Sequence, residues 1–145
     1  AGHYHRFLPN AEPGYSGRAQ LIQNFSAVTA ACMVVRSSVF DEVNGFDEEH
    51  LAVDFNDVDL CLKIRDRGYR NLYTPYARLF HLESASRGSS VDRKHRNRFG
   101  REIAFMKQKW GDCLLMDPSY NPNLSLHTEA GCRLADPPRL RSTSL

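Results

Sequence analysis

The stretch FNDVDLCLK at residues 55–63 holds two aspartates, Asp57 and Asp59, separated by one valine. Two nearby carboxylates can hold a divalent cation between them, and a single carboxylate can act as a general base. On a helical wheel with about 100° per residue, Asp57 falls inside the apolar arc, whereas Asp59 falls on the polar face with Lys63 and Asp66. The two carboxylates are therefore expected to point apart, which disfavours a shared metal unless Asp57 precedes the helix.

An acidic residue that faces inward at the start of a helix has two explanations. Asn56 or Asp57 can be an N-cap, whose side chain accepts hydrogen bonds from the first free backbone N–H groups. Alternatively, Asp57 can be a general base, which needs partial burial and a cleft that admits a hydroxyl group. The residues alone leave both explanations open. Asp59, four residues before Lys63, is expected to form a solvated ion pair with it.

Regular elements must position these side chains, and the apolar patterns predict such elements mainly in the middle of the chain. The first predicted elements are a buried strand at 27–36 and a short helix within 37–46, which is capped by Ser37 or Ser38 and ended by Asn44 and Gly45. A second helix is predicted at 55–67 and is ended by Gly68. Two short strands follow within 69–84 around Thr74 and Pro75, and a third helix runs from Val91 to about Trp110. We expect residues 1–18 to be irregular, and the chain beyond Asp117 to be extended with a disordered end.

Length and composition exclude several classes of protein. The 145 residues match one ordinary domain, and 41% apolar residues are enough to form a core. A net charge of +2 gives no reason to expect nucleic acid as a partner, and the longest apolar run, at 27–35, is far shorter than the roughly 20 residues of a membrane-spanning helix. The four cysteines form no CxxC pair, so we expect reduced thiols in the cytoplasm. Without an initiator methionine or a leader, the chain is expected to be a segment of a longer protein.

Four stretches carry a resemblance to a known family: TAACMVVRSSVF, NGFDEEHL, FNDVDLCLKIRDRGYRNLYTPYARLFHLESASRG and, more loosely, DPSYNPNLS. The first three cover most of residues 27–88 and the fourth lies at 117–125; in this order they resemble the carboxyl-terminal half of an inverting family 2 nucleotide-sugar glycosyltransferase. The resemblance implies an α/β fold, namely the acceptor-side half of a glycosyltransferase A-type fold with a mixed sheet and flanking helices. Residues 1–122 would belong to the catalytic domain, whose nucleotide-binding half lies upstream, and 123–145 would be an extended or disordered tail.

The resemblance also implies roles for particular residues. Asp57 falls on the aspartate that serves as catalytic base in that family, although Asn56 stands where the family often has glutamate. His81 matches a histidine that completes a divalent metal site, for Mn²⁺ or Mg²⁺, whose other ligands come from a DxD motif in the upstream half. Asp47 and Glu48 match the turn on the acceptor side, where they can bond sugar hydroxyls.

Two further segments could bind phosphate. Ser84, Ser86 and Arg87 follow His81 on a loop, where hydroxyl and guanidinium donors suit diphosphate oxygens, although such a loop can also be a solvated turn. The basic run at 92–101 is either the solvated face of the last helix or a surface that attracts diphosphates or anionic lipid. The pair of histidines in HYH, at residues 3–5, reads as part of a solvated loop.

The function expected from the resemblance is transfer of a sugar from a nucleotide diphosphate donor to an acceptor hydroxyl, with inversion, in cell-surface polysaccharide or glycan synthesis. The partners would be the nucleotide sugar and a glycan or lipid-linked acceptor, in the cytoplasm or at the inner face of the membrane. We expect the 145 residues alone to be inactive and to self-associate through an unpaired sheet edge. Two alternatives are a non-catalytic carbohydrate-binding or assembly module and a metal-dependent phosphoester hydrolase that uses Asp57, Asp59 and His81.

Overall fold

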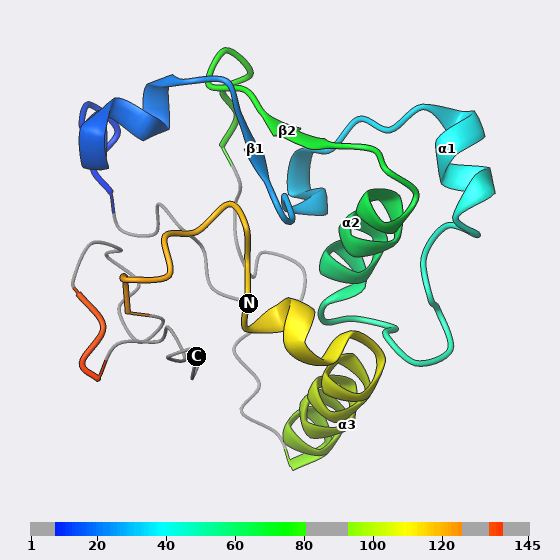
Figure 1. Ribbon diagram of the computed structural model, residues 1–145. Helices are drawn as coiled ribbons and strands as arrows, with labels where there is room; N and C mark the ends of the chain where they lie inside the picture. The colour runs from blue at the N-terminus through cyan, green and yellow to red at the C-terminus, as the bar shows by residue number, and fades with distance from the viewer. Residues whose placement is uncertain (1–7, 81–92, 126–133, 138–145) are drawn as a thin grey trace, which may run out of the picture.

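A computed structural model describes residues 8–80, 93–125 and 134–137 of the chain (Figure 1). In chain order the elements are the 3-10 helix η1 (Tyr15–Gln20), strand β1 (Gln23–Phe25), the 3-10 helix η2 (Ala30–Cys32), helices α1 (Ser37–Glu42) and α2 (Asn56–Asp66), strand β2 (Asn71–Tyr73), helix α3 (Arg93–Trp110) and the 3-10 helix η3 (Gly111–Leu114). The part of the chain that the structure describes is therefore a mixed α/β arrangement with a small sheet.

The two strands form one antiparallel sheet in which Gln23 faces Tyr73 and Phe25 faces Asn71. β2 confirms the first of the two strands predicted within 69–84. The second does not form at residues 76–80, which have no regular structure, and residues 81–84 lie outside the described part. β2 thus pairs with a segment that precedes the strand predicted at 27–36.

The prediction of a strand at residues 27–36 is wrong. This segment contains η2 and irregular backbone instead, and the side chain of Val34 is 97% exposed. A local hydrogen bond explains part of the difference, because the Thr29 hydroxyl accepts from the Ala31 N–H and caps the short 3-10 turn. Continuous apolar runs do not distinguish a buried strand from a segment whose neighbours cover only some of its side chains.

Helices α1 and α2 end where the sequence predicted, at residues in the left-handed region. After α1, Asn44 has φ 55° and the N–H of Gly45 donates to the Phe40 carbonyl at 2.9 Å. After α2, Gly68 has φ 84° and the Tyr69 N–H donates to the Ile64 carbonyl at 3.2 Å. Both patterns satisfy the last free carbonyls of a helix. The predicted cap by Ser37 or Ser38 is wrong, because the N-cap position of α1 is Arg36 and no side chain bonds there.

α2 is the central helix, with α1 on one side and α3 on another (Figure 1). Its contacts form two apolar clusters. The first joins α1 to α2 and consists of Val39, Val43, Leu60 and Ile64. The second joins α2 to α3 and contains Leu51, Leu62 and Met106, with Phe55, Val58, Phe105, Trp110 and Leu114 packed around them. Two faces of α2 are therefore buried, so the helix has less solvent-facing surface than a simple amphipathic helix.

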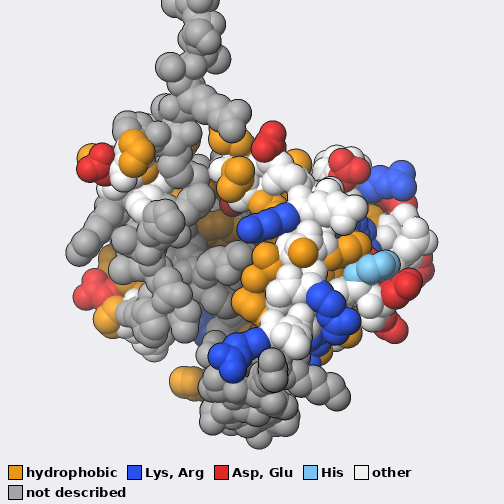
Figure 2. Space-filling model, turned by 90° about the horizontal axis from the view of Figure 1, so that it is seen from below, with side chains coloured by type: hydrophobic (Ala, Val, Ile, Leu, Met, Phe, Trp, Pro, Cys, Tyr) orange, Lys and Arg blue, Asp and Glu red, His pale blue; other side chains and the backbone are white. Residues whose placement is uncertain are grey.

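The face of α3 that points away from α2 is basic. Figure 2 views the molecule from the side of α3 and shows Lys and Arg side chains beside a group of hydrophobic ones. Arg96 and Arg101 of the basic run at 92–101 are exposed, as is Lys107, and both interpretations of that run expect exposed side chains. None of the described helices is long and apolar enough to cross a membrane.

Candidate functional site

Asp57 lies in the first turn of α2 and is half-buried. Its Oδ2 accepts a hydrogen bond from the Ala30 N–H at 3.1 Å, and its Oδ1 accepts one from the Val58 N–H at 2.8 Å. The N-cap position is Phe55, so neither Asn56 nor Asp57 occupies it, although Asp57 does satisfy one N–H group of the first turn. The carboxylate is held in one orientation by two N–H groups and keeps a lone pair on each oxygen for a further partner.

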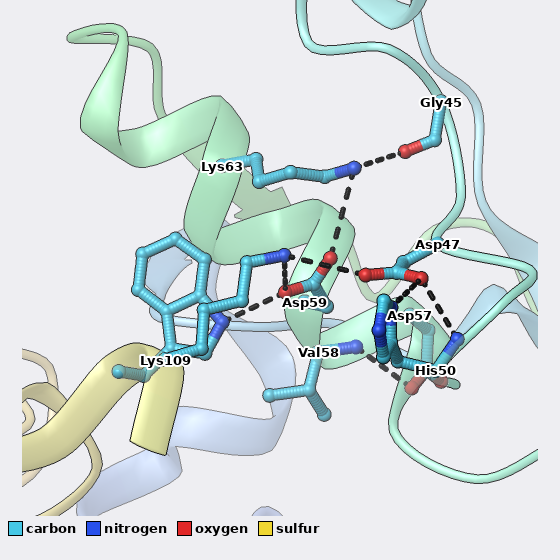
Figure 3. Close-up of polar contacts among 9 residues, drawn as sticks. Gly45, Asp47, His50, Asp57, Val58, Asp59, Lys63 and Lys109 are labelled. Carbon is cyan, nitrogen blue, oxygen red and sulfur yellow. Dashed lines mark hydrogen bonds and ion pairs between the residues drawn. The ribbon is translucent and has the colours of Figure 1, made fainter. Parts of the chain in front are cut away.

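The predicted exposure of Asp59 is wrong, because its side chain is 0% exposed. α3 covers this side of α2, which a wheel drawn for one helix does not show. Asp59 Oδ1 lies 2.8 Å from Lys109 Nζ and accepts a hydrogen bond from Trp110 Nε1 at 2.8 Å. The predicted pair with Lys63 is present, with Nζ 3.6 Å from Oδ2, but it is buried rather than solvated (Figure 3).

Asp47 belongs to the same group of charges. It accepts hydrogen bonds from the backbone N–H of His50 at 3.0 Å and from the imidazole Nδ1 at 3.1 Å, and Lys109 Nζ lies 3.8 Å from its Oδ2 (Figure 3). Burial raises the pKa of the Asp47 carboxyl, but the hydrogen bonds from His50 and the charge of Lys109 outweigh burial and hold the pKa below its ordinary value of 3.8. Glu48, the next residue, is exposed.

A second set of charged contacts lies just before α2. Glu102, whose side chain is buried, accepts a hydrogen bond from the Asp54 N–H at 2.8 Å. Arg98 lies between them, with its Nη2 3.8 Å from Asp54 Oδ2 and its Nε 3.6 Å from Glu102 Oε1. α3 therefore holds the chain both before and after Asp57.

The sequence analysis missed Glu102, Lys109 and Trp110 as parts of this site. A wheel of α3 contains the necessary signal, because Glu102 and Lys109 fall beside the predicted apolar stripe, within about 80° of Met106. Glu102 is also the one acidic residue in the sequence of α3. An isolated charge beside an apolar stripe predicts a buried partner.

His81, Ser86 and Arg87 lie outside the described residues, as does Ser84. Within the described ranges, no three His, Cys, Asp or Glu side chains are grouped as metal ligands would be. The Asp59 carboxylate points toward Lys109, and the Asp57 carboxylate lies away from it (Figure 3). This arrangement does not fit a single ion shared by Asp57 and Asp59, as the hydrolase alternative requires.

No family model matches the chain, and no solved structure matches it. Three of the curated proteins that are similar in sequence show the relationship. The uncharacterized protein y4gI of Sinorhizobium fredii is 51% identical over 126 residues, which are 87% of this chain and 14% of that protein. The O-antigen biosynthesis protein RfbC of Myxococcus xanthus is 36% identical over 118 residues, 81% of this chain and 9% of RfbC.

The third is the N-acetylglucosaminyl-diphospho-decaprenol L-rhamnosyltransferase of Mycobacterium tuberculosis, 34% identical over 61 residues, which are 42% of this chain and 20% of the enzyme. The chain thus spans one fifth or less of the length of each of these relatives. These similarities relate the chain to a glycosyltransferase and to a protein of O-antigen synthesis.

Proposed function

We propose that this chain is the acceptor-side part of an inverting glycosyltransferase that acts in polysaccharide or O-antigen synthesis. The observation that carries the proposal is the position of Asp57: a half-buried carboxylate in the first turn of α2, oriented by backbone N–H groups from two separate segments. The similarity to RfbC and to the rhamnosyltransferase supports the class of reaction. A general base must be held in place and must keep a free lone pair, and Asp57 meets both conditions.

In the proposed reaction, Asp57 accepts the proton of the acceptor hydroxyl. The freed oxygen forms a bond to the anomeric carbon of the donor sugar from the side opposite the leaving group. The bond between that carbon and the diphosphate oxygen breaks, and the nucleoside diphosphate leaves with the electron pair. One displacement of this kind inverts the anomeric centre.

The acceptor side of the site is proposed to lie at the turn that contains Asp47 and Glu48. Asp47 already accepts two hydrogen bonds from His50 and lies beside Lys109, so its role is to hold the turn. Glu48 is exposed and is the better candidate for a bond to sugar hydroxyls. The relative named as a rhamnosyltransferase has a diphospho-decaprenol compound in its name, and we propose a lipid diphosphate-linked sugar as the acceptor class, met at the inner face of the membrane.

The donor side is proposed from sequence alone, because its residues lie outside the described ranges. Ser86 and Arg87 would contact the diphosphate, and His81 would be one ligand of Mn²⁺ or Mg²⁺. When bound, such a metal would neutralise charge on the leaving group. Within the described ranges, no three His, Cys, Asp or Glu side chains form a cluster for it. Self-association of the 145 residues stays a prediction.

The test replaces the matched segment of RfbC with this chain and measures O-antigen in Myxococcus xanthus that lacks its own RfbC. We expect the chimera to restore O-antigen and Asp57→Asn to lower the rate of synthesis by about 100-fold or more. Asp66→Asn, the same chemical change at an exposed position of α2, is the matched control and should leave synthesis intact. A folded chimera that makes equal amounts of O-antigen with and without the Asp57→Asn change would contradict the base assignment. A binding module predicts instead that the folded chimera binds glycan and makes no O-antigen.

A further inference from the structure

We infer that α3 positions Asp57 by holding the residues on either side of it, with Lys109, Trp110 and Glu102 as positioning residues. This inference rests on the proposed function, because it assigns a purpose to the orientation of the Asp57 carboxylate. It adds residues from a helix that carries none of the predicted site residues. On each side of Asp57 one partner of the contact is buried, namely Asp59 on one side and Glu102 on the other.

α3 acts on Asp57 only through its neighbours. Within the described residues, the hydrogen bonds of the Asp57 side chain go to the N–H groups of Ala30 and Val58, neither of which belongs to α3. Two residues after Asp57, however, the Asp59 carboxylate bonds Lys109 and Trp110 of α3. Three residues before Asp57, the Asp54 N–H donates to Glu102.

Between these two anchor points the backbone is strained. Phe55, directly before α2, has φ 62°, in the left-handed region that side-chain-bearing residues rarely adopt. Its ring packs against Phe99 of α3, with 5.4 Å between the ring centroids. A residue in this conformation relaxes unless its surroundings prevent it, and relaxation at Phe55 would turn the first turn of α2 and move Asp57. The contacts from α3 hold Phe55 in place on both sides.

The contact between Asp59 and α3 also favours a positioning role. The fully buried Asp59 carboxylate is neutralised by Lys109 and Lys63, and Lys63 also donates to the Gly45 carbonyl. A buried ion pair adds little stability over well-packed apolar side chains of the same size, and in some proteins such a pair fixes the relative placement of two elements. Here that placement fixes the helix face next to Asp57.

The experiment measures the amide proton signal of Ala30 by NMR in the 145-residue chain. A carboxylate acceptor displaces this signal downfield, and Asp57→Ala, which has no side-chain acceptor, gives its position without that bond. We expect Lys109→Met to move the Ala30 signal at least about halfway toward the Asp57→Ala position, because the bond is then formed in fewer molecules. Lys109→Arg should restore most of the displacement. Lys107→Met removes a neighbouring exposed cation of α3 and should leave the signal in place.

Should Lys109→Met fail to fold, Trp110→Phe provides a second variant, which keeps an aromatic ring in the apolar cluster and removes the N–H donor to Asp59. We expect a smaller movement of the Ala30 signal in the same direction. Signals of the Val43 region, in the other cluster, report whether the rest of the fold is intact. An Ala30 signal that stays in place in folded Trp110→Phe and folded Lys109→Met overturns the inference.

The two proposals fail separately. If the Ala30 signal moves as expected but the RfbC chimera with Asp57→Asn makes normal O-antigen, the positioning stands and the base assignment falls. If Asp57→Asn stops synthesis but the Ala30 signal stays in place in Lys109→Met and Trp110→Phe, Asp57 keeps its role as the base. In that case α3 does not position it. Where both hold, Lys109→Met should lower kcat of the chimera and leave KM for the acceptor nearly unchanged.

Discussion

Lys109 Nζ lies 2.8 Å from Oδ1 of the fully buried Asp59 and joins the end of α3 to the first half of α2. The same ammonium group lies 3.8 Å from Oδ2 of Asp47, so one side chain links α2, α3 and the turn after α1. Asp59 and Lys109 are far apart in the sequence. Their contact buries Asp59, for which the pattern of α2 alone predicts solvent.

Asp59→Asn should destabilise the chain, by about 1–3 kcal/mol in the free energy of unfolding, because it leaves Lys109 and Lys63 next to a buried neutral amide. The Trp110 N–H can still donate to the amide oxygen, which limits the loss. Asp66→Asn, exposed at the end of the same helix, should change stability by less than about 0.5 kcal/mol. Denaturant unfolding of both variants measures the difference, and equal stability would show that Asp59 is not buried in solution.

Asp47 should make stability depend on pH in the acid range. Its folded-state pKa lies below the ordinary value of 3.8, so its contribution is present above pH 3.8 and is lost as the pH falls through the folded-state pKa. Near neutral pH, Asp47→Asn should therefore cost about 1 kcal/mol, through weakened bonds to His50 and loss of the Lys109 pair. The cost should shrink as the pH falls below 3.8.

Thermal melting of the wild type and of Asp47→Asn across that pH range checks the sign. Asp41→Asn, an exposed acid on α1, is the control for the general effect of removing one carboxylate. A difference in melting temperature between the wild type and Asp47→Asn that grows as the pH falls would contradict the prediction.

Alanine substitutions at three glycines should distinguish the effect of steric crowding on stability from the effect of backbone strain. At Gly45, φ is 51° and an added Cβ would lie 2.8 Å from the Phe40 ring, so Gly45→Ala should cost more than about 1 kcal/mol. At Gly68, φ is 84° with open space around it, and the cost should be about 1 kcal/mol from strain alone. Gly100 lies inside α3 in open space, and Gly100→Ala should stabilise by about 0.5–1 kcal/mol. Unfolding curves that rank the three variants differently would reject this explanation.

Cys61 should resist alkylation in the native chain. Its side chain is fully buried, burial raises the pKa of the thiol, and the thiolate is the form that reacts. Cys32 and Cys113 are exposed and free. Iodoacetamide labelling followed by peptide mass spectrometry should show Cys61 reacting at least about 100-fold more slowly than the other two, with the difference removed by denaturant. Comparable native labelling at Cys61 would mean that α2 opens readily.

Local patterns in the sequence were sufficient to predict the helices, because left-handed C-terminal residues and apolar spacing act within a few neighbouring positions. They predicted the ends of α1 and α2 at Asn44 and Gly68, the end of α3 at Trp110, and Asp57 as an acid in the first turn of α2. The pair of Asp59 and Lys63 also follows from their spacing of four on one helix.

Tertiary packing decided which polar side chains are buried and which segment forms the sheet. Asp59 is buried because α3, from a distant part of the chain, covers the polar side of α2 and supplies Lys109 and Trp110. Gln23–Phe25 forms the strand in place of the more apolar segment at 27–36, because β2 pairs with it. A strand or a buried charge is stable only with its partner, and the partner is set by how the helices and loops pack in space, which no local pattern encodes.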